Sequence, residues 1–154
     1  MEKNNTDFDA FKEEISNSFF FQIHRMKRTI FRHTNALMTE AGIYLQLEQL
    51  PLIMILQRKN LSQRELSDMT MRDKSSILRS INALEKKALV EVQKDEVDKR
   101  KNIVSLTEEG ITLAKNIRLL MKKAEDEVMA VFSAQERAQA LETIRGYADK
   151  LDTL

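Results

Sequence analysis

Residues 61–107 contain the most specific structural signals of the chain and read LSQRELSDMTMRDKSSILRSINALEKKALVEVQKDEVDKRKNIVSLT. Ser62 and Glu65 have the S-x-x-E spacing of a capping box, so a short helix is predicted to begin near Gln63. Asp73 is the next helix-start signal, because its carboxylate can accept a backbone hydrogen bond and suits the positive end of a helix dipole. These signals predict two helices joined by a short turn.

The second helix is predicted to have a buried side and an exposed side. The apolar positions that recur at helical spacing are Ile77, Ile81, Leu84 and Ala88. The opposite face has no acid near its start and consists of Ser75, Arg79, Asn82 and Lys86, with Lys74 and Ser76 beside its first turn. Such a face suits the major groove of DNA, since hydroxyls reach phosphates and arginine reads guanine edges. The alternative interpretation is an ordinary solvated helix face.

A hairpin is predicted to follow this helix. Residues 89–93 alternate like a half-buried strand, and residues 103–106 supply its partner. The loop between them contains neither glycine nor proline, so we expect a long, mobile tip that projects from the molecule. Its second half is Asp98-Lys99-Arg100-Lys101, and three cations at a projecting tip suit a minor groove or a phosphate backbone.

Several motifs of this stretch occur together, in order and at matching spacing, in one known family. They are Ser62 to Glu65, Lys74-Ser75-Ser76, residues 84–90 (LEKKALV), Asp98-Lys99-Arg100 and residues 104–110 (VSLTEEG). The sequence resembles the multiple-antibiotic-resistance regulator (MarR) family. That resemblance implies a dimeric, DNA-binding transcription regulator that a small ligand or an oxidant releases from DNA. It also implies that Arg100 enters the minor groove and that Asp98 steadies it.

The sequence departs from the family pattern at two positions. Ala88 stands where glycine is common, and Val92 stands where arginine is common. Ala88 predicts a helix end without a left-handed residue there, and Val92 removes one positive charge from the base of the wing. Neither departure touches the helix face or the tip.

The composition indicates a single domain in a reducing compartment. The chain has 154 residues and no cysteine, which excludes thiol redox sensing, disulfides and cysteine metal sites within it. No apolar stretch is long enough for a membrane span, and the start at Met1 lacks the pattern of a signal peptide. We therefore expect a cytoplasmic protein.

The charge distribution is more informative than the formal net charge of +1. Residues 58–101 contain twelve Lys or Arg and eight Asp or Glu, a net of +4. The segments before and after have nets of −1 and −2. The positive surplus is therefore concentrated in the unit expected to touch phosphates.

The two ends of the chain are predicted to form a dimerisation region. Residues 8–38 keep an apolar helical spacing, and three further phenylalanines spread apolar surface beyond one stripe, so one long helix with two partners is expected. A capping box at Ser133 opens a last helix whose apolar stripe has few places to be buried within one chain. The predicted fold is mainly α with a small β wing. A winged helix-turn-helix region at 41–107 is flanked by dimerisation helices at 1–40 and 108–154.

Two further helices complete the prediction. Residues 45–60 should form a helix buried beneath the two helices and hairpin predicted for residues 61–107, with some distortion at Pro51. Thr107 should cap another helix, and Gly110 in its first turn suggests close packing against a second backbone.

The resemblance to the MarR family also implies a ligand site between the dimer helices and the winged unit, where the first helix, the connection from Gly42 to Leu47 and the helix after Thr107 approach each other. Side chains of suitable aromatic, apolar or polar-tipped chemistry are Phe20, His24, Phe31, His33, Met38 and Tyr44. The alternative is ordinary core and dimer packing. A small aromatic or apolar ligand is the expected class.

Catalysis and metal binding are not expected. His24 and His33 are nine residues apart, which places them on different sides of a helix, and no phosphate loop or nucleophile motif is present. We predict no enzyme, no cofactor and no metal site.

Two hypotheses of different kinds follow. The first is a sequence-specific, ligand-responsive repressor that binds a near-palindromic duplex as a homodimer. Its predicted DNA contacts are Gln63, Arg64, Lys74, Ser75, Ser76, Arg79, Asn82, Lys99, Arg100 and Lys101. The second is a winged dimerisation or protein-interaction module without specific DNA binding, which the near-neutral charge and Val92 support.

Overall fold

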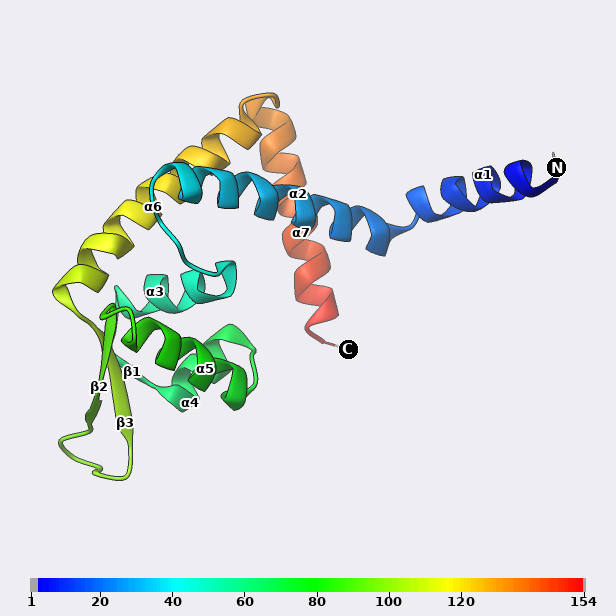
Figure 1. The fold of residues 1–154 in the computed structure, drawn as a ribbon. Helices are drawn as coiled ribbons and strands as arrows, with labels where there is room; N and C mark the ends of the chain where they lie inside the picture. The colour runs from blue at the N-terminus through cyan, green and yellow to red at the C-terminus, as the bar shows by residue number, and fades with distance from the viewer. Residues whose placement is uncertain (1–2, 154) are drawn as a thin grey trace.

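The computed structural model describes residues 3–153 and shows a mainly helical chain with one small sheet (Figure 1). Its helices are α1 (Lys3–Ser16), α2 (Phe19–Glu40), the 3₁₀ turn η1 (Leu47–Gln49), α3 (Leu50–Leu56), α4 (Gln63–Thr70), α5 (Lys74–Glu85), α6 (Glu108–Met129) and α7 (Ala134–Leu151). The strands are β1 (Leu61–Ser62), β2 (Val90–Lys94) and β3 (Asn102–Leu106), in the order β1-β3-β2. Met1, Glu2 and Leu154, the outermost residues of the predicted dimerisation region, lie outside the described residues.

The winged helix-turn-helix region contains most of the core. The predicted stripe of α5 is buried at Ile77, Ile81 and Leu84, and it packs with residues of α3, α4 and the sheet. The apolar positions of this stripe recur every three or four residues, so they face one direction and leave the other side of α5 exposed. Ala88, predicted as the end of the stripe, is exposed. The predicted fold class is confirmed.

The end of α5 differs from the prediction. Ala88 has a φ of +55°, in the left-handed region, so the expectation of a helix end without a left-handed residue is wrong. The amide of Leu89 donates to the carbonyl of Leu84 at 3.0 Å, which closes the last turn. The chain therefore needs the left-handed conformation here even though it has no glycine to supply it.

The sheet contains one strand that the periodicity did not reveal. β2 and β3 form the predicted hairpin, with Val92 opposite Val104. β1 is only two residues long and pairs with β3 through Leu61 and Ser62, immediately before α4. A strand this short has no detectable alternation.

The segment predicted as one helix over residues 45–60 is shorter and composite. It consists of η1 followed by α3, which ends at Leu56. Gln46 and Gln49 form a reciprocal cap on η1, and Pro51 lies in the first turn of α3, where its missing N–H is tolerated. The distortion expected at Pro51 is thus present as the change from η1 to α3.

The N-terminal helix is also divided, so the prediction of one continuous helix over residues 8–38 is wrong. α1 ends at Ser16, Ser18 has extended backbone, and α2 begins at Phe19. The hydroxyl of Ser16 donates to the carbonyl of Glu13 at 2.9 Å, and residues 16–18 are Ser-Asn-Ser, whose side chains compete for backbone hydrogen bonds. The apolar spacing continues across this break, which conceals it in the sequence.

α6 joins the wing to the terminal helices. Thr107 caps it by accepting from the amide of Gly110 at 3.0 Å, as predicted. A Cβ at Gly110 would lie 2.0 Å from the carbonyl oxygen of Leu89, so the close approach of a second backbone is confirmed. Beyond its first turn, α6 packs against α2.

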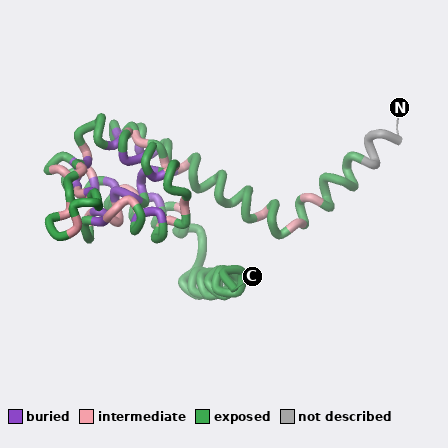
Figure 2. The backbone as a smooth tube through the Cα atoms, turned by 90° about the horizontal axis from the view of Figure 1, so that it is seen from below, coloured by how far each residue is buried: buried purple, intermediate pink, exposed green. Residues whose placement is uncertain are grey.

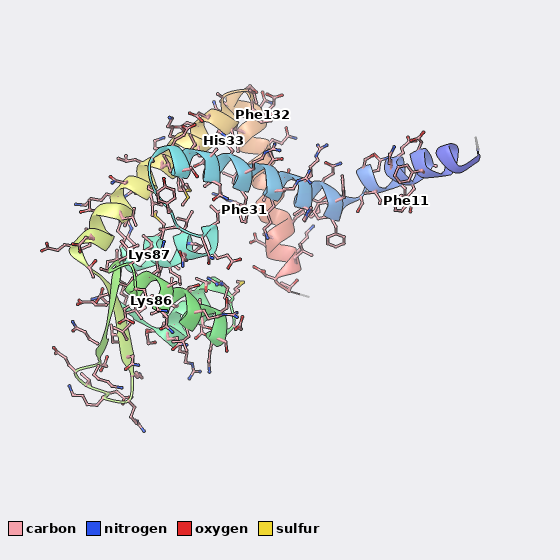
Figure 3. The ribbon with its side chains drawn as sticks, viewed as in Figure 1. Phe11, Phe31, His33, Lys86, Lys87 and Phe132 are labelled. Atoms are coloured by element: carbon pink, nitrogen blue, oxygen red, sulfur yellow. The ribbon has the colours of Figure 1, made fainter. Side chains whose placement is uncertain are left out.

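The terminal helices leave a large apolar surface open in the single chain. The capping box of Ser133 and Glu136 opens α7 as predicted, yet no residue of α7 is buried (Figure 2). Phe11 on α1, Phe31 on α2 and Phe132 beside α7 are exposed as well (Figure 3). Within residues 3–153, no helix combines the length and the hydropathy that a membrane span requires.

Candidate nucleic-acid interface

The exposed face of α5 has the composition that the sequence predicted. Ser75, Arg79 and Asn82 are exposed on it, and Lys74 is exposed at its start. Asp73 is committed to the cap, since its Oδ1 accepts from the amide of Ser76 at 2.8 Å. The first turn of α5 contains no acidic residue, so the face presents hydroxyl, amide and cationic groups to an approaching anion.

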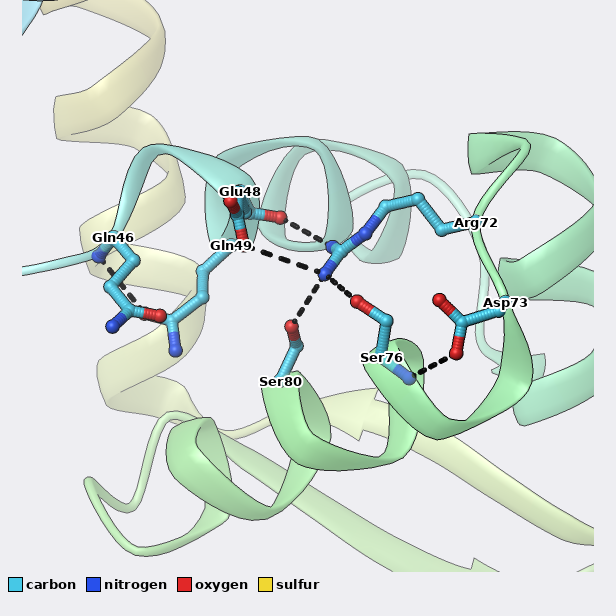
Figure 4. Close-up of polar contacts among 7 residues, drawn as sticks. All are labelled: Gln46, Glu48, Gln49, Arg72, Asp73, Ser76 and Ser80. Carbon is cyan, nitrogen blue, oxygen red and sulfur yellow. Dashed lines mark hydrogen bonds and ion pairs between the residues drawn. The ribbon is translucent and has the colours of Figure 1, made fainter.

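Ser76 is placed differently from the other predicted contacts. Its hydroxyl accepts from Nη2 of Arg72 at 2.6 Å, and its side chain is half-buried (Figure 4). The Ser76 hydroxyl is therefore already engaged in a hydrogen bond within the protein. Sequence reasoning missed Arg72, because a polar residue in the turn between two helices carries no periodic signal.

α4 contributes one residue that supports α5 and one that is free to reach outward. Nε2 of Gln63 donates to the carbonyl of Lys74 at 2.9 Å, so this predicted backbone contact of DNA holds the first turn of α5. Arg64 is exposed, and its Nε lies 4.0 Å from Oδ2 of Asp68. An exposed pair at that distance contributes little to stability and leaves the guanidinium available.

The capping box of α4 is formed as predicted. The amide of Ser62 donates to Oε2 of Glu65 at 2.8 Å, and the Ser62 hydroxyl donates to the same oxygen at 2.7 Å. Hydrogen bonds from the Ser62 hydroxyl and amide hold the pKa of Glu65 below its usual value. The first turn of α4, next to β1, therefore carries a negative charge and has both hydrogen bonds of its capping box.

The wing tip brings the predicted Asp98 and Arg100 together. Oδ1 of Asp98 lies 3.2 Å from both the amide nitrogen and Nε of Arg100. The Arg100 side chain is 91% exposed, whereas that of Asp98 is only 31% exposed. Arg100 is thus restrained at its Nε while its remaining donors face outward. Lys99 and Lys101 on either side are exposed.

The loop that carries this tip is more organised than a long, mobile segment would be. Oδ1 of Asp95 accepts from the amides of Val97 at 2.9 Å and Asp98 at 2.7 Å. The amide of Lys101 donates to the carbonyl of Asp98 at 2.8 Å, and the amide of Asp95 donates to the carbonyl of Lys101 at 3.0 Å. The two amides that Asp95 accepts from lower its pKa. The sequence signal for this turn is Asp95 itself, because an aspartate side chain can accept hydrogen bonds from backbone amides two or three residues further on.

The six predicted ligand residues do not form one pocket. Met38 and Tyr44 lie at a cavity of about 610 Å³ whose lining also includes Arg32, Asn35, Ala36, Thr39, Ile43 and Leu45. His33 lies instead at a cavity of about 260 Å³ between α2 and α6, with its Nε2 3.0 Å from Oε2 of Glu127. Phe20, His24 and Phe31 line neither cavity and are exposed on α2. The single chain therefore does not bring these six residues to one cavity, and the shared ligand site stays a prediction.

A third cavity was missed by the sequence analysis. It has a volume of about 570 Å³ and lies between α3 and α4, with a lining that includes Pro51, Met54, Ile55, Leu61 and Met69. No periodic pattern marks it, because its lining comes from two short helices and the connection between them.

Comparison with known proteins identifies the fold. The model of the MarR family matches residues 45–101. The structure is similar to that of the PcaV transcriptional regulator from Streptomyces coelicolor in complex with its natural ligand, with a TM-score of 0.76 and 20% identity over 88% of this chain and 94% of that one. No curated protein matches the sequence significantly.

Two more solved structures have the same fold. Bordetella bronchiseptica BpsR, whose DNA binding is regulated by 6-hydroxynicotinic acid, has a TM-score of 0.76 and 18% identity over 87% of this chain and 95% of that one. Apo MarR from E. coli has a TM-score of 0.69 and 19% identity over 84% of this chain and 96% of that one. The match to the MarR family model over residues 45–101 covers most of the motif-bearing stretch 61–107, and these solved structures have the same winged helix-turn-helix fold.

Proposed function

We propose that this chain is a transcriptional repressor that binds a near-palindromic DNA site as a homodimer. The observation that carries the proposal is the position of two cationic surfaces on one side of the molecule. α5 and the tip of the β2–β3 wing both lie on the side of the molecule away from α2 (Figure 1). α5 would enter the major groove, with Ser75, Arg79 and Asn82 near base edges or phosphates.

The wing would extend the contact along the duplex. Asp98 restrains Arg100 by its Nε, which leaves the two terminal nitrogens to enter the minor groove. Lys99 and Lys101 would face the phosphates on either side. Arg64 at the start of α4 and Lys74 at the start of α5 would contact the backbone near the major groove. Gln63 would serve mainly to hold α5.

The open apolar surface of α1, α2 and α7 supports a dimer. Leu141, Ile144 and Leu151 share one side of α7 and are about half exposed in the single chain. Contiguous exposed apolar surface of this kind marks an association site, and most soluble homodimers are two-fold symmetric. Such a dimer would present two copies of α5 about 34 Å apart, one turn of DNA.

A small ligand is the proposed inducer. The relatives PcaV and BpsR are described with a natural ligand and with 6-hydroxynicotinic acid, respectively. The cavity beside Met38 and Tyr44 combines apolar walls with the guanidinium of Arg32, which could pair with a carboxylate. Aromatic acids are therefore the class to test. Raised melting temperature and weakened DNA binding are expected together, and an unchanged melting temperature would argue against this class.

The decisive experiment is selection of bound duplexes from a random pool by the purified protein. A two-fold symmetric consensus with half-sites one DNA turn apart is expected. Binding to the selected site should weaken steeply with salt, with a slope of roughly one unit per phosphate contact. No enrichment, together with a flat salt response, would favour a winged interaction module that does not read DNA.

Arg79 should carry part of the base preference. Arg79→Ala should relax discrimination at one position of the selected site by about 1–3 kcal/mol, because a guanidinium contact to a guanine edge is lost. Competition binding with single-base variants of the site measures this. The matched control is Arg118→Ala, an exposed arginine on α6 that lies outside the proposed interface. Equal discrimination by wild type and Arg79→Ala would remove Arg79 from base reading.

A further inference from the structure

Arg72 is the residue around which the helix-turn-helix is joined. It lies in the turn between α4 and α5, directly after Met71, whose φ of 52° is left-handed. Its amide donates to the carbonyl of Ser67 at 3.2 Å, and its carbonyl accepts from the Ser67 hydroxyl at 2.5 Å. The backbone of Arg72 is thus fixed to α4 before its side chain makes any contact.

The guanidinium of Arg72 connects two other elements. Nη1 donates to the carbonyl of Glu48 in η1 at 2.8 Å, while Nη2 donates to the hydroxyls of Ser76 at 2.6 Å and Ser80 at 3.2 Å in α5 (Figure 4). The carboxylate of Glu48 lies 3.8 Å from Nη2. The Arg72 side chain is only 21% exposed, so its terminal nitrogens are directed into the protein rather than outward.

Ser76 and Ser80 lie one turn apart on one edge of α5. At 100° per residue, this edge falls between the buried stripe of Ile77 and the exposed face of Arg79. Lys87 lies just past the end of α5, and its Nζ donates to the carbonyl of Tyr44 at 2.5 Å. α5 is therefore tied to residues 44–49 through Arg72 near its start and through Lys87 just past its end.

These contacts restrain rotation of α5 about its own axis, which the apolar core does not restrain. Burial of Ile77, Ile81 and Leu84 favours contact with the core but is non-directional, so it tolerates small rotations of α5 about its axis. Hydrogen bonds depend on angle and distance, and an arginine fork fixes several partners in one plane. η1 is a firm anchor for such a fork, because the amide of Gln46 donates to Oε1 of the buried Gln49 at 3.2 Å.

We infer that Arg72 is a positioning residue that sets the rotation of α5 relative to η1 and thereby aims Arg79, without contacting DNA itself. The part of this inference that concerns Arg79 rests on the proposed DNA binding. The part that concerns the rotation of α5 does not. Two kinds of measurement separate the two parts.

The test compares Arg72→Met with Arg64→Met, the same substitution at an exposed arginine of α4. For each variant, affinity for the selected site and for a random duplex is measured across a salt series. In Arg72→Met, the ratio of specific to random affinity should fall about tenfold or more, since a charged hydrogen-bond network is lost. Random-duplex affinity and its salt slope should stay at wild-type values. In Arg64→Met, both affinities should fall together and the salt slope should decrease.

A second substitution removes a partner rather than the arginine. Ser80→Ala deletes a hydroxyl that is buried and has Arg72 as its partner, while leaving every proposed DNA contact in place. It should lower the specificity ratio in the same direction as Arg72→Met, by a smaller factor. Arg72→Lys should fail to restore the ratio, because an ammonium group cannot span three acceptors in one plane.

Amide hydrogen exchange supplies a readout that does not depend on DNA. In Arg72→Met, the amides of residues 76–81 and of η1 should lose protection, while those in the middle of α6 should keep it. A uniform loss across the chain, with both DNA affinities reduced in proportion, would assign Arg72 a merely structural role. A reduced salt slope for random duplex would make it a phosphate contact. Either result would overturn the inference. If wild type bound no duplex at all, the proposed function would fall, and the exchange pattern would still decide the role of Arg72 in holding α5.

Discussion

Ala88 lies in the turn after α5 and has a backbone conformation that suits glycine. Its φ of +55° costs an L-residue roughly 1–2 kcal/mol, and the turn of Leu89 onto Leu84 requires it. Ala88→Gly should therefore raise the free energy of unfolding, by about 0.5–1 kcal/mol once the greater freedom of glycine in the unfolded chain is included. Urea denaturation followed by circular dichroism measures the change.

Ala83→Gly is the matched control for this prediction. Ala83 lies inside α5, where glycine is unfavourable, so the same substitution should lower the free energy of unfolding by about 1 kcal/mol. The two variants should thus shift the urea midpoint in opposite directions. A loss of stability in Ala88→Gly would mean that the left-handed turn is not strained.

For single residues, the sequence predicts which side chains are exposed better than it predicts which side chains they contact. Periodicity places Ser75, Arg79 and Asn82 on the exposed face of α5, and the structure finds them there. It cannot show that Ser76 is turned toward Arg72, because that contact depends on how α4, α5 and η1 meet in space. For the same reason it cannot show that His33 and Met38 line different cavities of the folded chain.

Among the elements, the wing loop should respond to pH through Asp95. Hydrogen bonds from the amides of Asp98 and Val97 depress the pKa of Asp95 below its ordinary value of 3.8. A depressed folded-state pKa means that the carboxylate stabilises the loop fully above the ordinary value, and that this contribution is lost as pH falls through the folded value. The amide resonances of Val97 and Asp98 should therefore shift together below pH 3.8 in an NMR titration.

Asp95→Asn provides the control for this titration. An asparagine side-chain oxygen can accept the same two amide hydrogen bonds but carries no charge. The resonances of Val97 and Asp98 should keep the positions of the intact loop, and their common transition should disappear. A transition that persisted in Asp95→Asn would assign the pH response to another group.

The elements with strong local signals were predicted correctly. Capping boxes at Ser62 and Ser133 and the cap at Thr107 mark real helix starts, because each depends on residues within one turn. The break at residues 16–18 and the strand β1 were missed. Apolar periodicity passes through the break unchanged, and β1 exists only because β3, some forty residues later, supplies its partner.

The whole molecule is expected to be stable only as a pair of chains. α7 has no buried residue, and a solitary helix of its length is marginal in water, so we expect the proposed dimer to stabilise it. The melting temperature of the protein should therefore rise with protein concentration. Light scattering at micromolar concentration should give the mass of a dimer, and a monomeric mass there would remove the dimer from the proposal.

Ile144→Glu tests which side of α7 meets the partner. A carboxylate placed in an apolar interface without a cation costs roughly 3 kcal/mol or more, so the variant should be largely monomeric and should lose tight binding to a two-fold symmetric site. Gln139→Glu adds the same charge on the opposite side of α7 and should remain dimeric. Equal dissociation of both variants would indicate a general effect of negative charge on α7.

The missing side chain of Gly110 has a mechanical consequence for this assembly. With the first turn of α6 directly against the backbone of Leu89, and with the Thr107 hydroxyl donating to the carbonyl of Ala88 at 2.7 Å, the corner between wing and α6 has no room to flex. We therefore expect α6 and the hairpin to move together as one rigid unit. If the proposed dimer adapts to DNA half-sites of different spacing, we expect the change to occur at the interface between the two subunits, because the contact between the wing and α6 is too close to bend.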